Sequence, residues 1–144
     1  MTQEREDFSA LLQAAKDAAG RAYAPYSGFR VGAAVLDAAG RVFTGCNVEN
    51  ASYGLSLCAE RAALAAAVAG GAQCIQALAL WFLDLSGPGE KTPDGADTPC
   101  GACRQWLVEL APEAVVVTNQ TPEPMSVDSL LPNSFRIQPK NSRK

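Results

Sequence analysis

The 144-residue sequence contains no histidine. Histidine is the commonest general base in enzymes and the commonest metal-ligating residue. Its absence excludes every catalytic triad that depends on an imidazole ring. A metal site in this chain must therefore be built from cysteine, aspartate or glutamate side chains.

Long apolar segments and an excess of basic residues are missing as well. The longest apolar runs, 62–69 and 77–83, are too short to cross a bilayer. Residues 2–7 are polar and acidic, unlike a signal peptide, so we expect a cytoplasmic protein without a membrane partner. The formal net charge of −3 argues against a protein that binds nucleic acid through its phosphates.

Five cysteines are present, and in a reducing compartment they favour metal binding or catalysis over disulfides. Cys100 and Cys103 form a C-x-x-C at a predicted helix start, which by itself indicates a redox pair, half of a zinc site or a coincidence. Its late position does not fit the strand–helix turn of a thioredoxin-like redox pair. Cys46 and Cys74 lie within predicted strands and are expected to be small buried residues.

The hydrophobic pattern predicts a single α/β domain over residues 1–144, with its core at about 8–135 and a flexible tail at 136–144. A hairpin closed by the turn 37–40 precedes strands that alternate with helices, so the sheet should be mixed and covered by helices on both faces. The Gly-, Pro- and Asp-rich stretch 86–98 should be a surface loop. We expect helices at 4–23, 58–69 and 101–110, a helical turn at 126–131, and strands at 30–36, 42–46, 74–83 and 115–118.

A third candidate ligand, Cys58, begins the sequence Cys-Ala-Glu-Arg at another predicted helix start, with Ser56 as a candidate cap. Together with Cys100 and Cys103 it offers three thiolates to one zinc ion. Three protein ligands leave one tetrahedral position open for water, as in catalytic zinc sites, whereas structural sites are closed by a fourth ligand.

Zinc and three thiolates carry a net negative charge, which has to be offset before a bound water can ionise. Two helix N-termini and the guanidinium of Arg61 are predicted to offset it. Arg104 is interpreted as part of a surface salt bridge. Glu60 has two interpretations: a first-turn glutamate that favours the helix dipole, or a proton shuttle beside the metal.

Segments 58–61 (Cys-Ala-Glu-Arg) and 99–105 (Pro-Cys-Gly-Ala-Cys-Arg-Gln) resemble the two zinc motifs of the small homotetrameric cytidine deaminases. Zinc-dependent nucleobase deaminases as a class place a glutamate two residues after the first ligand and then a Pro-Cys-x-x-Cys. The similarity covers about 11–135, and its further segments are 23–34, 45–53 and 130–135.

The resemblance implies a three-layer α/β/α fold with a mixed sheet of roughly five strands, and one Zn²⁺ per subunit. It implies hydrolytic deamination of cytidine and deoxycytidine in pyrimidine salvage, with release of ammonia. In that reaction Glu60 accepts the proton of the attacking water and passes it to ring N3 of the base, and it then helps to protonate the departing ammonia. The implied assembly is a homotetramer whose active sites are shared between subunits.

The resemblance also implies a nucleoside pocket. Asn47 and Glu49, two residues apart on a strand and so facing the same way, are expected to bind the ribose hydroxyls. The simpler interpretations are that Asn47 is a turn former and that Glu49 is a solvated charge. The remaining contacts expected with the base or sugar come from Phe29, Ala51, Tyr53, Ala59 and Phe135, of which Ala51, Tyr53 and Phe135 act from a neighbouring subunit.

Two segments depart from the family pattern: the loop 85–98, which is unusually long, and the tail 136–139. The loop either changes a subunit contact or the pocket rim, or is a neutral insertion. Three alternative functions stay open. They are deamination of a related aminopyrimidine nucleoside such as blasticidin S, a structural zinc module with a closed site that gives Glu60 no task, and editing of polynucleotides, which the acidic chain disfavours.

Overall fold

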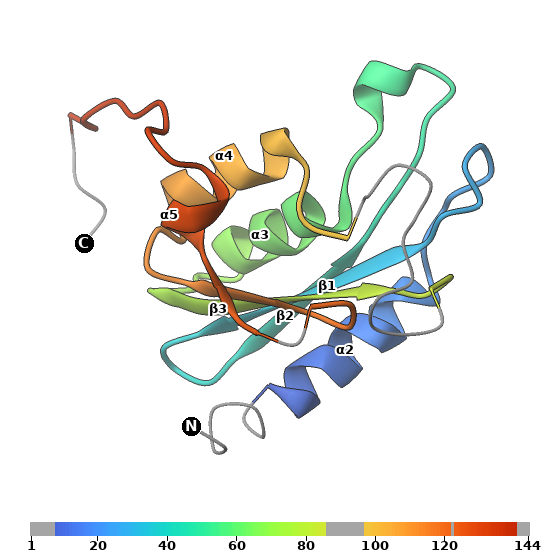
Figure 1. Cartoon of the computed structure of the whole chain (residues 1–144), viewed down its shortest axis with the longest axis horizontal. Helices are drawn as coiled ribbons and strands as arrows, with labels where there is room; N and C mark the ends of the chain where they lie inside the picture. The colour runs from blue at the N-terminus through green and yellow to red at the C-terminus, as the bar shows by residue number, and fades with distance from the viewer. Residues whose placement is uncertain (1–7, 86–96, 122, 141–144) are drawn as a thin grey trace.

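The structure, a computed structural model, describes residues 8–85, 97–121 and 123–140. A five-stranded mixed sheet with strand order β2-β1-β3-β4-β5 separates helix α2 from helices α3 and α4 (Figure 1). This is the expected three-layer α/β/α architecture. The strands are β1 (Val31–Asp37), β2 (Val42–Cys46), β3 (Ile75–Phe82), β4 (Val115–Thr118) and β5 (Met125–Ser126); the helices are α2 (Ser9–Ala19), α3 (Ala59–Ala69), α4 (Gly101–Leu110), α5 (Val127–Leu130) and the 3₁₀ turn η1 (Tyr53–Leu55).

The connections place the first turns of α3 and α4 at the same edge of the sheet. β1 pairs antiparallel with both β2 and β3, so β2 and β3 point in the same direction. α3 follows β2, and α4 follows β3, which pairs parallel with β4. Helices that follow strands of one direction begin at the carboxyl edge of those strands, where ligand sites of α/β proteins are found.

The two faces of the sheet bury side chains of different size. On the α3 and α4 face, β3 contributes Leu78, Leu80 and Phe82 to the larger core. On the α2 face it contributes Ala77 and Ala79. Because side chains alternate along a strand, this pattern predicts a strand covered on both faces, as found.

Two glycines allow the helices to pack closely against the sheet. A Cβ at Gly32 in β1 would collide with the α2 backbone at Ala15 and Ala19. A Cβ at Gly45 in β2 would collide with the backbone of α3 at Ala62 and Ala63. The second contact fixes the start of α3 against the sheet, close to the cysteine at its N-cap.

Several boundaries differ from the expected ones. The helix expected at 4–23 ends at Ala19, because Gly20 caps it and Tyr23 forms a bridge with Val48; residues 4–7 lie outside the described part of the chain. β1 is shifted by one residue toward the C-terminus, and β3 is one residue shorter at each end than expected. The expected loop 86–98 lies outside the described residues except for its last two positions.

Two local expectations were wrong, and two short elements were not predicted. Cys58, not Ser56, is the N-cap of α3, and the Ser56 hydroxyl instead accepts a hydrogen bond from Asn50 N. Cys74 is exposed and has a φ of 49°, so it precedes β3 instead of packing inside it. β5 and η1 were not predicted, because segments of two and three residues carry no periodic pattern.

Within the described ranges, no helix combines the length and the apolar character needed to span a membrane.

An ion pair between the buried Asp37 and the partly exposed Arg41 joins the β1–β2 turn to the end of α3. Asp37 is 1% exposed and accepts hydrogen bonds from Ala39 N, Arg41 N and Arg41 Nε. The Arg41 guanidinium also donates to the carbonyls of Gly70 and Gly71. Burial alone raises the pKa of Asp37, but the hydrogen bonds and charge of Arg41 outweigh it and hold that pKa below its ordinary value.

The Asp37→Asn variant is expected to melt several degrees below the parent protein at neutral pH. Because the folded pKa lies below the unfolded one, the carboxylate stabilises the fold above about pH 4 and loses this effect as the pH falls through the folded pKa. Thermal unfolding followed by circular dichroism from about pH 7 to pH 3 should show the difference shrinking. Asp128→Asn, at an exposed ion pair with Arg136, is the matched control and should track the parent.

Candidate functional site

Three cysteines meet where α3 and α4 begin. Cys58 is the N-cap of α3, Cys100 is the N-cap of α4, and Cys103 lies in the first turn of α4. The Sγ atoms of Cys58 and Cys100 are 3.7 Å apart, and those of Cys100 and Cys103 are 3.4 Å apart. All three lie within 4.8 Å of one another. Two helix starts at one edge of the sheet thus bring together thiols that are 42 residues apart in the chain.

The donor set fits zinc. Sulfurs that bind one zinc tetrahedrally at about 2.3 Å are separated by about 3.8 Å, close to the separations found here. Among the described residues, the cluster able to hold a metal consists of Cys58, Cys100 and Cys103, and neither Cys46 nor Cys74 belongs to it. The site therefore offers three thiolates and leaves a position for water or substrate.

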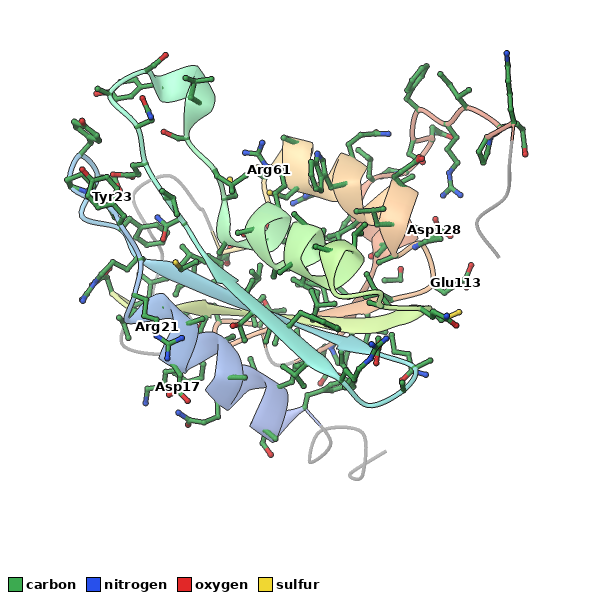
Figure 2. All side chains as sticks on the ribbon, turned by 180° about the vertical axis from the view of Figure 1, so that it is seen from behind. Asp17, Arg21, Tyr23, Arg61, Glu113 and Asp128 are labelled. Carbon is green, nitrogen blue, oxygen red and sulfur yellow. The ribbon has the colours of Figure 1, made fainter. Side chains whose placement is uncertain are left out.

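Hydrogen bonds and a neighbouring positive charge stabilise the thiolate form of Cys58. The Arg61 guanidinium donates to Cys58 Sγ at 3.5 Å. Hydrogen bonds from Cys103, Arg61 and Cys100 outweigh the effect of burial and lower the pKa of Cys58 to about 5, while the interaction with Cys58 raises that of Cys103. Figure 2 shows Arg61 at the end of α3 that faces the start of α4. An arginine and two helix N-termini favour the thiolate form of a cysteine, and the thiolate is the form that binds a metal ion.

Arg61 has one buried nitrogen, Nε, without a hydrogen-bond partner among the described residues. We expect Arg61→Gln to weaken zinc binding by roughly 10- to 100-fold, since residues that support metal ligands contribute about this much. Competition with a chromophoric chelator measures the change. Arg21→Gln, at an exposed arginine in the turn after α2, is the control and should bind zinc like the parent. Equal zinc affinity of the Arg61 variant and the parent would contradict the assigned role.

Glu60 is buried next to the thiols. Its residue is 5% exposed, and it lies in the first turn of α3. Burial, together with the charge of Cys58, raises the pKa of Glu60 to about 7, and its carboxyl also interacts with Cys103. A carboxyl group with a pKa near neutrality can both accept and release a proton at physiological pH. A buried glutamate is costly at a purely structural position, so its environment favours the proton-shuttle interpretation over the helix-dipole one.

A polar hollow lies beside Glu49, with a volume of about 200 Å³. Its lining consists of Tyr26, Ser27, Glu49, Tyr53 and Ser56. The Glu49 carboxylate accepts hydrogen bonds from Tyr26 N, Ser27 N and the Ser27 hydroxyl, and the Ser27 hydroxyl bond is the largest cause of its lowered pKa. Glu49 is thus an anchored, ionised acceptor and not a freely solvated charge.

Asn47 and Phe29 both contribute to the packing of the chain where β1 begins. Asn47 Oδ1 accepts from Val31 N, and its Nδ2 donates to Phe29 O. The simple interpretation of Asn47 as a turn former was wrong, because its amide joins the end of β2 to the start of β1. The Phe29 ring lies 5.9 Å from that of Phe82 and packs against the larger core.

The remaining predicted pocket residues are not all brought together within one chain. Ala59 is fully buried in the first turn of α3, whereas Ala51 is exposed. Tyr53 is 76% exposed and meets the Tyr26 ring edge to face at 6.1 Å. Phe135 is 71% exposed and lines a different cavity, on α3 and α4. A single copy therefore does not place Tyr53 and Phe135 in one pocket.

Arg104 does not form the expected surface salt bridge. Its guanidinium donates to Pro99 O, Leu130 O and Thr98 Oγ1, and no carboxylate is among its partners in the described part of the chain. The sequence reasoning also missed Ser27, which holds Glu49. Its position in a Pro-Tyr-Ser-Gly turn gave a signal only for chain reversal, not for a contact 22 residues away.

Comparison with known proteins decides the family. A sequence profile described as the cytidine and deoxycytidylate deaminase zinc-binding region matches residues 5–119. The chain belongs to the cytidine and deoxycytidylate deaminase family. Members of this family are zinc-dependent hydrolases, and the matched region contains Cys58, Cys100 and Cys103.

Individual members of the cytidine and deoxycytidylate deaminase family are similar over most of their length. A probable cytidine deaminase of Dictyostelium discoideum is 40% identical over 91% of this chain and 85% of its own. The crystal structure of cytidine deaminase from Mycobacterium tuberculosis superposes with a TM-score of 0.77 at 41% identity, covering 91% and 98% of the two chains. That from Burkholderia pseudomallei gives a TM-score of 0.72 at 45% identity, covering 88% and 97%.

Proposed function

We propose that the protein converts cytidine and deoxycytidine to uridine and deoxyuridine in pyrimidine salvage, with water as the co-substrate and ammonia as the second product. The observation that carries this proposal is the buried carboxyl of Glu60 beside three thiols at two helix starts. Family membership supports it, and so do the cytidine deaminases among its relatives.

Cys58, Cys100 and Cys103 are proposed to hold one zinc ion. Bound zinc supplies a Lewis acid that activates water and stabilises negative charge on oxygen. Glu60 accepts one proton from the attacking water and delivers it to ring N3; it then takes the proton of the new C4 hydroxyl and passes it to the departing amino group, which leaves as ammonia. Its pKa near 7 suits both directions of this transfer. Arg61 donates a hydrogen bond to Cys58 Sγ and so stabilises negative charge on that sulfur.

The sugar is proposed to bind at the hollow next to Glu49. The Glu49 carboxylate is held by three hydrogen bonds from Tyr26 and Ser27, which orient it without using all of its lone pairs. It can therefore accept from a ribose hydroxyl. Asn47 retains a second amide hydrogen for a sugar oxygen, and Phe29 supports the pocket from the core side. Backbone groups at Ala59 and at the neighbouring ligands Cys58 and Cys100 are proposed to form hydrogen bonds with the exocyclic amino group.

A homotetramer with shared active sites is proposed as the working form. A largely apolar cavity of about 700 Å³ lies on the outer side of α3 and α4. Val68 and the half-exposed Trp106 are part of its lining, and an apolar surface of this kind is typical of a subunit interface. Phe135 lines this cavity and is exposed in one copy, so association there would bring it against a neighbouring subunit. Tyr53 and Ala51, exposed elsewhere in one copy, are proposed to act on a neighbouring subunit at a separate contact.

Trp106→Glu is expected to dissociate the assembly, because a charge at the centre of an apolar contact has no partner. Light scattering after gel filtration measures the change in mass. Activity per subunit should fall with it, since part of each pocket comes from another copy. Gln76→Glu, an exposed position on β3 with the same gain of charge, is the matched control and should remain assembled. A tetrameric Trp106→Glu protein would contradict this assignment of the interface.

The function is tested by incubating the zinc-loaded protein with a panel of aminopyrimidine nucleosides, with ammonia and the deaminated product followed together. Cytidine and deoxycytidine are expected to be turned over, and blasticidin S and cytosine base much more slowly. Preferential turnover of blasticidin S would assign the protein to the related deaminase instead. We also propose a cytoplasmic location, in keeping with five cysteines that are all free of disulfides.

A further inference from the structure

The part of α4 that follows Cys103 carries two polar side chains directed at the C-terminal segment. Arg104 donates to Leu130 O at 2.6 Å, and Gln105 Nε2 donates to Phe135 O at 2.8 Å. Both acceptors are main-chain carbonyls of the segment 130–135. The two residues next to a proposed metal ligand therefore hold segment 130–135 against α4.

Arg104 joins this segment to the loop that enters the metal site. Its Nε donates to Pro99 O at 2.7 Å, and its Nη2 donates to Thr98 Oγ1 at 2.8 Å. Thr98 and Pro99 directly precede Cys100. The planar guanidinium offers donors in a fixed fork, so it sets the distance between this loop and Leu130 at the end of α5. Charged donors also form stronger bonds to carbonyls than neutral ones do.

Gln105 fixes the position of Phe135 through the backbone. The Phe135 ring is 71% exposed, so packing within one copy does little to hold it. Arg136 adds bonds to Ser134 and Asp128, but this ion pair is exposed and contributes little. The carbonyl bond from Gln105 is thus the contact that ties the Phe135 backbone to a rigid helix.

We propose that Arg104 and Gln105 are positioning residues that hold segment 130–135 in a fixed relation to the metal loop 98–100, so that Phe135 is presented to the base of a nucleoside in a neighbouring subunit. This inference rests on the proposed function. It links the metal centre of one copy, through one turn of α4, to substrate binding in the next. Arg104 serves both ends of this link, and Gln105 serves only the Phe135 end.

The first test is Gln105→Glu, which keeps the shape of the side chain but replaces the donor with an acceptor. The KM for cytidine is expected to rise roughly three- to tenfold with little change in kcat, the range expected for one lost hydrogen bond. Zinc content should stay the same. Gln73→Glu, an exposed residue in the turn after α3, is the matched control and should leave KM unchanged.

A double-mutant cycle shows whether Gln105 acts through Phe135. In a Phe135→Ala background, Gln105→Glu is expected to change KM by less than about twofold, because coupled residues are non-additive. Full additivity of the two changes would overturn the proposal, since it would mean that Gln105 acts on substrate binding by another route.

Hydrogen exchange tests, without an activity measurement, whether Arg104 and Gln105 hold segment 130–135. Gln105→Glu is expected to speed amide exchange in 131–137 while zinc release to a chelator stays at the parent rate. Arg104→Lys is expected to speed both, because one ammonium cannot span three acceptors. Unchanged exchange in 131–137 in either variant would overturn the proposal. A zinc-loaded parent protein without turnover would refute the proposed function instead. The exchange result would still decide whether Arg104 and Gln105 hold segment 130–135.

Discussion

Glu60→Gln is expected to reduce kcat for cytidine by about 10²- to 10⁴-fold, the usual contribution of a positioned general acid–base group. Glutamine fills the same buried space but cannot accept the proton of the attacking water or deliver one to N3. The three thiols and Arg61 are untouched, so the variant should still bind one zinc per subunit. Steady-state kinetics combined with metal analysis on the same preparation measures both quantities.

The loss should appear mainly in kcat, because Glu60 acts on protons that move during the reaction. KM should change much less, since the groups proposed to bind the sugar lie around Glu49. Glu113→Gln, an exposed glutamate in the turn before β4, is the matched control and should keep parent activity. Near-normal turnover by a zinc-replete Glu60→Gln protein would contradict the proton-shuttle role.

Cys100→Ala is expected to abolish measurable deamination by removing the metal. Two remaining thiols cannot hold zinc as three do, so zinc affinity should fall beyond the roughly 10- to 100-fold caused by changes in supporting residues. Cys100 lies at the exposed side of the site, at an N-cap where its side chain accepts no capping bond, so its replacement should not unfold the chain. Zinc content and activity are measured on protein dialysed against a metal-free buffer.

The control for this variant is Cys74→Ala, at an exposed cysteine outside the metal cluster. It should retain zinc and activity, which separates loss of a ligand from loss of any thiol. Adding excess zinc to Cys100→Ala should recover little turnover. Full activity of a zinc-free Cys100→Ala protein would show that the reaction does not depend on the cysteine cluster.

The sequence was most informative where chemistry depends on short spacing. Cys100 and Cys103 are three residues apart, so one helical turn places them together. Cys58 and Glu60 are two residues apart at the start of α3, where the N-cap and the first turn lie close to each other. The hydrophobic pattern likewise predicted β2, α4 and β4 at their observed bounds. These features depend on local geometry, which a sequence specifies directly.

The features that sequence reasoning missed depend on contacts between distant segments. Arg104 was assigned to the surface, but its partners include Leu130, 26 residues away, and no spacing rule indicates that contact. The bond between Ser27 and Glu49 spans 22 residues in the same way. Cys74 was assigned to a strand because its neighbours are apolar, whereas the chain turns there with a positive φ. Tertiary structure, not propensity, determines each of these positions.

The central claim is that a metal held by the three cysteines, with Glu60 beside it, deaminates cytidine. The most direct measurement follows uridine and ammonia released from cytidine by one preparation before chelation, after chelation and after zinc is restored. We predict that uridine and ammonia are released in equimolar amounts, that this release stops on chelation, and that it resumes when zinc is restored. Release that persists in the metal-free protein, or none from the zinc-loaded protein, would contradict the account.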